Sequence, residues 1–324
     1  MANPSEQFPN PVGIDLDITA KKGEKFSVED GFTWLVRGFA FLTVAILFWM
    51  TWVVFTKAQP AIAKFGLGFF TSTTWDVPNE IFGALPYIYG TLFSSILSLL
   101  IAVPIGLAVA LVTSEDIFPQ KVRTPVAFIV ELIAAIPSVV IGLWGFFVLS
   151  PFLRPAQQWL YDNFKVIPLF STPPSDTNML MAGIILGIMI LPTMAAISRD
   201  VLLLVPKELR TGSMALGSTR WETIFRVILP SGLSGIVGAA MLALGRALGE
   251  TMAVTLIIGN NPLISASLFD PGYTIPAVLA VEFAEATDFH ISALMYLALI
   301  LFALTLVVNI GAVLFVQSLG AKNR

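Results

Sequence analysis

The chain has 324 residues, of which 56% are hydrophobic and only 12% are charged, and its formal net charge is −3. Soluble domains usually carry about 25% charged residues. Several windows here are apolar over roughly twenty residues, the length that crosses a hydrocarbon core about 30 Å thick. This composition excludes an ordinary soluble domain and predicts an all-α, polytopic membrane protein. The absence of cysteine also excludes disulfides and thiolate metal sites.

The N-terminal part of the chain is polar. Residues 1–33 carry mixed charge, whereas a signal peptide begins with a short basic region followed at once by an apolar run. We therefore expect 1–33 to be a cytosolic tail. A first transmembrane helix is predicted over 34–57, and an outer loop over 58–85, rich in aromatic residues and glycine, is expected to pack on the outer rim.

Five more apolar segments follow, which gives six predicted spans in total. Pro104 falls inside the second span and Pro137 inside the third, and proline kinks a membrane helix without excluding it. Residues 318–324 are predicted to be a cytosolic tail. The five later spans are expected at 86–113, 124–150, 179–198, 231–258 and 291–317.

The positive charges predict the orientation of the chain. Lys and Arg collect on the cytoplasmic side of a membrane. With the N-terminus inside, thirteen of the eighteen Lys and Arg residues lie on inner segments and four lie on outer segments. The eighteenth is Arg246, which lies inside a span. Both termini are therefore expected in the cytoplasm.

The outer loop 151–178 has two open interpretations. It is either an interfacial segment with Trp159 and Tyr161 at headgroup level, or a docking surface for an external partner.

A cytoplasmic loop between the fourth and fifth spans is bracketed by Pro206 and Pro230. Helix-forming residues between them are interrupted by Gly212 and Gly217, and apolar residues then recur at helical spacing. A basic loop that only sets topology needs no such pattern. The pattern predicts a short helix, a glycine turn and a second, amphipathic helix.

The run Ala215–Trp221, followed by Leu229-Pro230, resembles the "EAA" loop of ABC importer permeases, whose short helix docks in a cleft of the ATPase subunit. Gly217 and Pro230 match that spacing, while Thr211-Gly212-Ser213 replaces Glu-Ala-Ala. The resemblance implies a type I ABC importer permease core over 86–317, with a coupling loop at 206–230. The coupling residues that it implies are Thr211, Gly212, Ser213, Ala215, Leu216, Gly217, Arg220 and Trp221.

Two intramembrane stretches resemble signatures of phosphate-specific permeases. They are Glu131–Ser138, running on to Gly142–Gly145, and Gly245–Val254, followed by Gly259-Asn260. A phosphate importer uses two different permeases, the PstC type and the PstA type. The residues that follow these motifs, together with the long third outer loop, favour the PstC type.

This resemblance implies an importer of inorganic phosphate in a bacterial inner membrane. Its other parts would be a PstA-type permease, a homodimer of ABC ATPases and a periplasmic or lipid-anchored phosphate-binding protein. The chain contains no Gly-Lys dipeptide and hence no P-loop, so we do not expect it to be an enzyme, and the ATPase would bind ATP and Mg²⁺. Lipid is an expected partner and nucleic acid is not. The open alternatives are a permease for sulfate or molybdate and, from another class, an ion-coupled secondary transporter.

Arg246 and Glu250 are charges within an apolar run, and on a continuous helix residues four apart share one face. Gly245 and Gly249 form a small-xxx-small pair that would let another helix approach closely. One interpretation is an internal ion pair. In the other interpretation, the guanidinium of Arg246 donates hydrogen bonds to a tetrahedral oxyanion and Glu250 balances its charge. We favour this interpretation because charged residues within the membrane are functional candidates.

Further residues are expected along the path. Counting the helical rise from Arg123 places Glu131 about 12 Å inside the membrane. Two roles remain open for Glu131: a direct bond to Arg246, or a structural role near an inner gate. Ser138 follows Pro137, which frees backbone groups nearby. A hydroxyl stripe on the second span is a weaker candidate, for which helix packing is favoured over an anion path; it consists of Thr91, Ser94, Ser95 and Ser98.

Overall fold

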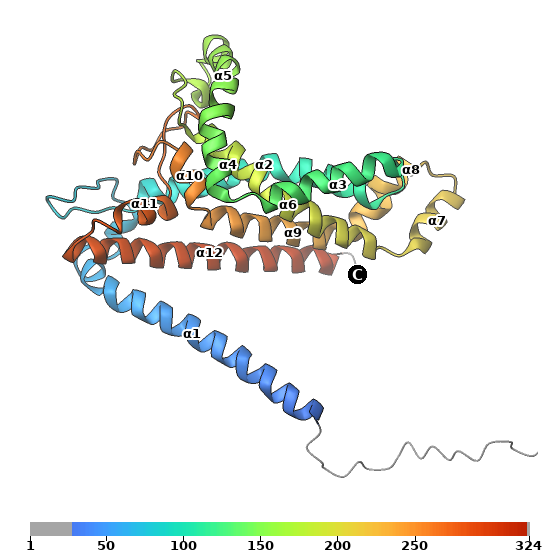
Figure 1. Ribbon diagram of the computed structural model, residues 1–324, viewed down its shortest axis with the longest axis horizontal. Helices are drawn as coiled ribbons and strands as arrows, with labels where there is room; N and C mark the ends of the chain where they lie inside the picture. Colours follow the sequence, from blue (N-terminus) through green and yellow to red (C-terminus); the bar gives the residue numbers. More distant parts are fainter. Residues whose placement is uncertain (1–27, 323–324) are drawn as a thin grey trace, which may run out of the picture. The chain divides into compact units, whose positions relative to one another are not determined.

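A computed structural model describes residues 28–322, and side chains are described for residues 31–314. Helices dominate this part of the chain, which contains isolated β-bridges and no β-strand (Figure 1). Six helical segments are long and apolar enough to cross a membrane, which confirms the predicted fold class. They are Gly31–Phe70, Leu85–Ser114, Ser138–Phe164, Met179–Leu204, Arg220–Gly249 and Asp288–Leu314.

The predicted tails lie partly outside the described residues. Residues 28–33 and 318–322 belong to helices α1 (Val28–Phe65) and α12 (Asp288–Lys322), so both helices extend beyond the predicted spans. The chain divides into two units within α1, between Trp52 and Val53. In the first unit nearly every described side chain of α1 is exposed, including Phe41 and Phe48. A helix that is apolar on all sides suits lipid as its surroundings.

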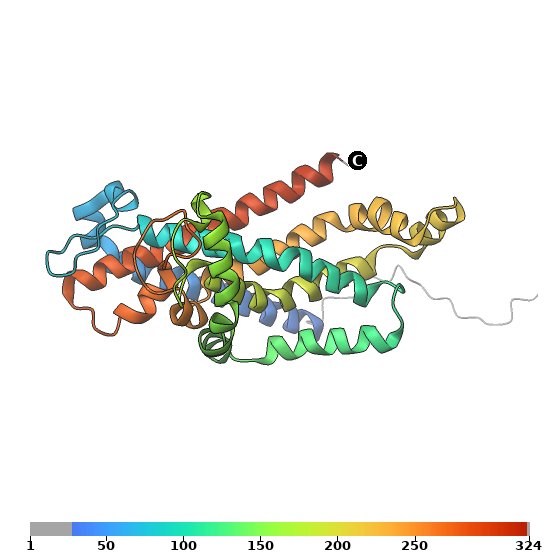
Figure 2. The same cartoon turned by 90° about the horizontal axis from the view of Figure 1, so that it is seen from above.

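Three helices form the centre of the second unit: α2 (Leu85–Ser114), α6 (Met179–Leu204) and α9 (Leu229–Gly249), which run alongside one another (Figure 2). Small residues bring α2 and α6 close together, because a Cβ on Gly183 would lie 2.4 Å from a methyl group of Leu97. The buried core between the three helices includes Ala102, Ala110, Ile190, Met194, Leu202, Ile236, Ala239 and Ala243.

The third predicted span, 124–150, is wrong as a continuous helix. Helix α3 (Gln120–Ala135) ends before Pro137, and a new helix begins at Ser138. Proline has no N–H to continue the ladder and holds the residue before it in extended conformation, as found at Ile136 (φ −74°, ψ 129°). The proline accounts for the local geometry of the break, whereas α2 and α6 continue as helices through Pro104 and Pro192.

The second helical part consists of α4 (Ser138–Trp144), a π-helical turn (Gly145–Leu149) and α5 (Ser150–Phe164). Figures 1 and 2 show α5 directed across the long helices rather than along them. Trp159 and Tyr161 of the predicted 151–178 loop are therefore helical, and the irregular segment begins only after Phe164.

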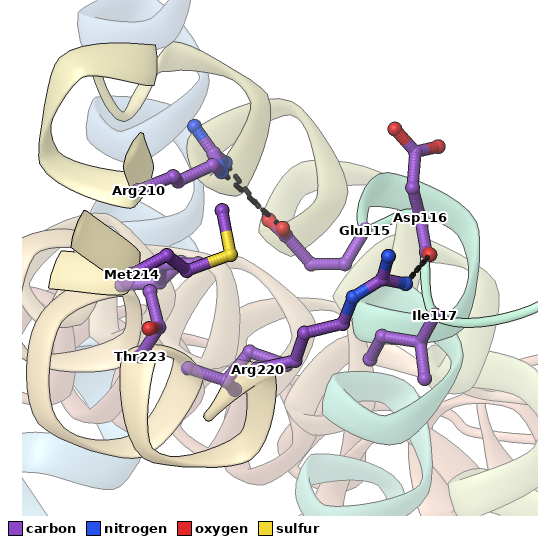
Figure 3. Close-up of a pocket in the computed structure, with 9 residues that line it drawn as sticks. Glu115, Asp116, Ile117, Arg210, Met214, Arg220 and Thr223 are labelled. Carbon is purple, nitrogen blue, oxygen red and sulfur yellow. Dashed lines mark hydrogen bonds and ion pairs between the residues drawn. The ribbon is translucent and has the colours of Figure 1, made fainter. Parts of the chain in front are cut away.

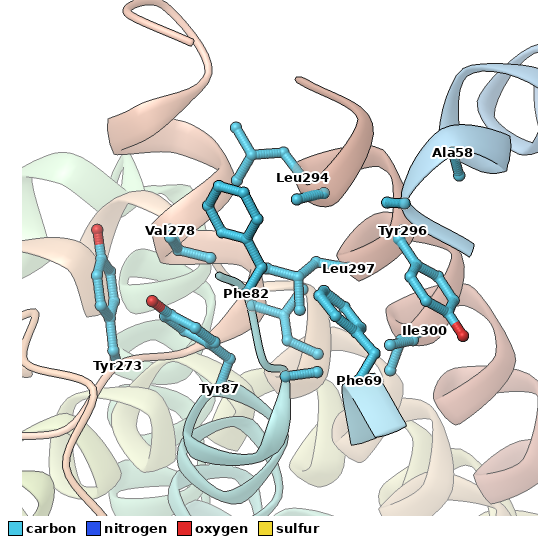
Figure 4. Packing of buried hydrophobic residues seen from close by; sticks show 14 of the residues in the cluster. Ala58, Phe69, Phe82, Tyr87, Tyr273, Val278, Leu294, Tyr296, Leu297 and Ile300 are labelled. Carbon is cyan, nitrogen blue, oxygen red and sulfur yellow. The ribbon is translucent and has the colours of Figure 1, made fainter. Parts of the chain in front are cut away.

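Figure 1 shows α11 (Ile275–Glu282) at the end of the bundle away from α7 (Lys207–Ala215), and a second core of buried residues lies there. Figure 4 shows how these residues pack. Phe69 and Phe82, from the predicted outer loop 58–85, are buried against the start of α2, α11 and α12. The Phe69 and Tyr296 rings stack with centroids 4.5 Å apart. This loop is thus packed into the fold, as the sequence predicts.

Gly90 offers a test of this packing. A Cβ at position 90 would lie 2.2 Å from the carbonyl oxygen of Tyr273, whereas a Cβ at Gly238 would meet nothing within 4 Å. We expect Gly90→Ala to destabilise the protein by about 1–3 kcal/mol through overpacking and to lower its thermal unfolding midpoint in detergent. Gly238→Ala is the control and should leave the midpoint unchanged or slightly raised. Equal midpoints for the two variants would contradict the described contact.

Candidate functional site

Arg246 lies in the last turn of α9, and the helix ends at Gly249. Glu250 has extended geometry (φ −68°, ψ 128°), and α10 (Met252–Ile257) begins two residues later. The single helical face predicted for Arg246 and Glu250 is therefore wrong, because the spacing rule needs an unbroken helix. Gly249 itself has no neighbour within 4 Å of where a Cβ would be, and Gly245 faces Asn309 Oδ1 at 3.9 Å.

The two charges make separate contacts. Arg246 Nη1 donates to Thr193 Oγ1 on α6 at 3.1 Å, and Glu250 Oε1 accepts from the backbone N–H of Ala253 at 3.3 Å. Among the described residues no ion pair joins Arg246 to Glu250. A direct Glu131–Arg246 bond, one of the two alternatives left open for Glu131, is not formed either. The internal ion pair is thus not the arrangement of this conformation.

Arg246 is exposed on the surface of the chain although it lies deep in the fold. Its neighbour Gly245 faces Asn309, which is close to the middle of the 35-residue helix α12. A charged side chain at such a depth does not face hydrocarbon without a large penalty, roughly 2.5–3.5 kcal/mol or more. The exposed side of Arg246 therefore requires polar surroundings from outside this chain.

The two stretches singled out by sequence lie against each other. Gly142 of α4 packs on α10, since a Cβ there would lie 2.9 Å from Ala253 Cα. The break before Ser138 and the break at Glu250 therefore belong to neighbouring segments. Ser138 is the first residue of α4 and is half-buried. In membranes, broken helices occur where the freed backbone groups are buried in protein or line a polar cavity.

Glu131 lies elsewhere, in a polar cavity of about 310 Å³ between α2, α3 and α6. The cavity also contains Arg199, which sequence reasoning treated only as a topology charge. Nothing in the sequence distinguishes Arg199 from other positive residues at the ends of spans. The residues that line the cavity are Thr113, Gln120, Arg123, Thr124, Ala127, Phe128, Glu131 and Arg199.

The hydroxyl stripe on α2 is buried inside the bundle. Thr91, Ser94 and Ser98 each donate to a backbone carbonyl three or four residues earlier, and Thr91 also accepts from the backbone N–H of Ile275 at 2.9 Å. Ser95 Oγ is buried without a hydrogen-bond partner. These contacts are those of helix packing, the interpretation that the sequence favoured.

The loop between α6 and α9 has the predicted form. Helix α7 is followed by Gly217 at φ +90°, a conformation that favours glycine. Thr219 and Glu222 then form a capping box at the start of α8 (Arg220–Thr223), which continues through a π-helical turn (Ile224–Ile228) into α9. Ser213 and Thr223 hydroxyls bridge α7 and α8 at 3.0 Å.

This loop exposes an apolar surface. Leu216 is 90% exposed, and the exposed rings of Trp221 and Phe225 stack with centroids 6.1 Å apart. Thr211 donates to a carbonyl within α7, and Gly212 has open space around its Cα. An exposed apolar surface such as the one formed by Leu216, Trp221 and Phe225 is typical of a docking site.

Two acidic residues after α2 hold the loop in place (Figure 3). Glu115 and Arg210 form a largely buried bidentate pair, with Nη2–Oε1 at 2.8 Å and Nε–Oε2 at 3.2 Å. Arg220 Nη1 donates to the Asp116 carbonyl at 2.7 Å. Sequence reasoning missed both acidic residues. The available signal was a pair of carboxylates at the end of the second span, on a side that is otherwise basic.

The chain matches the family model of binding-protein-dependent transport system inner membrane components over residues 102–321. Proteins named "Phosphate transport system permease protein PstC" are similar over most of their length. The one from Mesorhizobium japonicum is 43% identical (88% of this chain, 89% of the relative), and that from Pasteurella multocida is also 43% identical (83% and 85%). A "Probable" PstC from Methanocaldococcus jannaschii is 37% identical (81% and 85%).

Solved structures share the fold at lower identity. A chain of a bacterial alginate ABC transporter, in complex with an alginate-bound periplasmic protein, aligns with a TM-score of 0.57 at 17% identity (89% of this chain, 96% of that chain). A chain of the inward-facing MetNI methionine ABC transporter aligns with a TM-score of 0.53 at 18% identity (73% and 94%).

The fold is therefore that of an ABC importer permease, built into a multi-pass membrane protein. The chain belongs to the family of binding-protein-dependent transport system inner membrane components and, within it, to the PstC-type permeases.

The Glu115–Arg210 pair can be tested by proteolysis. Removing one partner of a buried ion pair costs about 3–5 kcal/mol, so Glu115→Gln should loosen α7 and speed trypsin cleavage after Arg210 by about tenfold or more. Glu208→Gln is the control, because Glu208 is exposed on the same helix and outside the pair. Equal cleavage rates in both variants would show that Glu115 does not hold the loop.

Proposed function

We propose that this chain is the permease subunit of an ATP-driven importer that moves inorganic phosphate into the cell. Its similarity to proteins named as phosphate permeases supports the substrate. The observation that carries the mechanism is Arg246, which is exposed near the helix breaks and, among the described residues, is held by one hydrogen bond, to Thr193.

Arg246 would hold phosphate in transit. Its guanidinium is always charged and its parallel N–H groups match two oxygens of a tetrahedral oxyanion. The bond to Thr193 uses Nη1 and leaves the other nitrogens available. Glu250, at the adjacent helix break, would limit how tightly the anion is held.

A PstA-type permease would complete the path as the second half of a heterodimer. The apolar cavity of about 490 Å³ between α3, α4 and α6 supports this, since it is lined by Ile133, Ile136, Val140, Ile141, Trp144 and Ile188 and has almost no polar surface of its own. Apolar recesses of this kind suit a packed partner helix or lipid.

A homodimer of ABC ATPases would dock on the apolar surface of α7 and α8 and would bind ATP and Mg²⁺. Movement of the docked loop would pass through two contacts, Arg210 with Glu115 and Arg220 with Asp116, into α2 and α3. The docking side would be cytoplasmic, with both termini on that side of a bacterial inner membrane. A periplasmic or lipid-anchored phosphate-binding protein would deliver phosphate on the opposite side, where α5 and the segment after it offer a surface.

The mechanism predicts that Arg246→Gln lowers phosphate uptake by about tenfold or more, because a hydrogen bond to a charged group contributes about 1.5–3 kcal/mol. Arg246→Lys keeps the charge without the planar fork and should retain part of the uptake. Uptake of labelled phosphate is measured alongside co-purification of the complex, with Arg37→Gln on α1 as the charge-matched control. Normal uptake by an assembled Arg246→Gln complex would contradict the assignment.

The same assay separates the other two transport classes. Uptake blocked equally well by sulfate or molybdate would identify a permease for another oxyanion. Uptake that persists without the ATPase would identify an ion-coupled secondary transporter instead.

A further inference from the structure

The polar cavity that contains Glu131 and Arg199 is not explained by the path through Arg246. It lies between α2, α3 and α6 and has a volume of about 310 Å³. A smaller adjoining cavity of about 50 Å³ shares Thr113, Glu131 and Arg199 with it. Neither cavity contains Arg246, Glu250 or Thr193. The cavity is thus a separate polar chamber in the same chain.

Several polar groups in this chamber have no partner. Arg199 Nε is fully buried and donates to no acceptor. Within the described residues, the side chains of Gln120, Thr124 and Glu131 also make no hydrogen bond or ion pair. Gln120, Thr124 and Glu131 are exposed to the cavity and need no partner from the protein. Arg199 Nε is different, because a buried polar group is normally paired and one that is left unpaired needs an explanation. A bound polar ligand would satisfy it.

The polar groups that line the cavity, including Arg199 and the already paired Arg123, suit one kind of ligand. Two guanidiniums, an amide and a hydroxyl can donate to the oxygens of a tetrahedral anion. Glu131 is different, because an ionised carboxylate only accepts hydrogen bonds. A fully deprotonated anion such as sulfate would place a bare oxygen against it. Phosphate near neutral pH keeps at least one proton and offers a P–OH donor to Glu131.

We propose that this cavity is a second phosphate site, in which Arg199 and Arg123 hold the oxygens and Glu131 accepts a hydrogen bond from the P–OH group. The proposal rests on the proposed function and adds selectivity to it. The site admits a protonated oxyanion and rejects sulfate, because sulfate would leave Glu131 unpaired against a negative oxygen.

The site is connected to the coupling loop through Arg123. Arg123 forms an ion pair with Asp116 and donates from Nη2 to the Thr113 carbonyl at 3.0 Å. The backbone of Asp116 in turn accepts from Arg220 of α8. A movement of α8 is therefore transmitted to Arg123 through two contacts, Arg220 with Asp116 and Asp116 with Arg123. This places the site where docking of the ATPase changes its affinity.

The test measures binding of labelled inorganic phosphate to the complex of this chain, its partner permease and the ATPase in lipid nanodiscs. The binding protein is left out so that its own selectivity does not intervene, and Arg246→Gln is used as background so that the Arg246 site adds nothing. We expect phosphate to bind and roughly a hundredfold excess of sulfate not to displace it.

Two variants then separate the roles of the charges. Glu131→Gln supplies an amide donor in place of the carboxylate, so sulfate should compete within about tenfold of phosphate. Arg199→Gln should weaken phosphate binding by about tenfold or more. Asp200→Asn is the matched control, because it removes a carboxylate next to Arg199 that does not line the cavity, and it should change neither value.

A lipid headgroup with a phosphate monoester offers the same chemistry as free phosphate. Binding in pure phosphatidylcholine nanodiscs assigns the site to the free ion. Displacement by added phosphatidic acid that depends on Arg199 assigns the site to the lipid as well.

No phosphate binding in the Arg246→Gln background, or sulfate exclusion that survives Glu131→Gln, would overturn the second site. Neither result would affect the proposed function. That function fails only if the full importer with its binding protein shows no ATP-dependent phosphate uptake.

Discussion

A guanidinium within an apolar span must have polar partners, and among the described residues Arg246 has one, the hydroxyl of Thr193. The rest of its donors lie on the exposed side of α9. In the proposed importer, water, the passing anion and a second permease would complete the surroundings of Arg246. The residue proposed to carry transport would then also require assembly.

The broken helices address the same constraint because they free polar backbone groups. Pro137 stops α3, the chain leaves helical geometry at Glu250, and Gly142 allows the two new segments to pack on each other. Backbone groups freed in this way are polar and fixed in place, which suits a path for an ion. At the opposite end, Glu115 and Asp116 connect the α7–α8 loop to α2 and α3. The exposed α7–α8 loop is therefore joined to α2 and α3 by an ion pair and an arginine–carbonyl hydrogen bond as well as by apolar packing.

Sequence reasoning recovered what depends on local pattern. Hydropathy predicted six spans, although the third is broken before Ser138. The glycines and the apolar spacing of residues 206–230 predicted two short helices around a glycine turn, and a charge inside an apolar run identified Arg246. It did not recover what depends on how helices end. Proline is tolerated in membrane helices, so Pro137 predicted a kink, and no proline marks the break at Glu250. Partners such as Arg199 for the cavity and Glu115 for Arg210 are brought together only by tertiary packing.

In the proposed importer, the exposed side of Arg246 faces a water-filled path. The chain has no cysteine, so a single introduced cysteine reports its own surroundings. The most direct measurement is labelling of Arg246→Cys by a charged, membrane-impermeant thiol reagent, compared with Phe302→Cys on the exposed side of α12. Position 246 should react in the assembled complex because water reaches it, and position 302 should stay unlabelled because it faces lipid. Equal protection of both positions in an assembled complex would contradict a water-filled path at position 246.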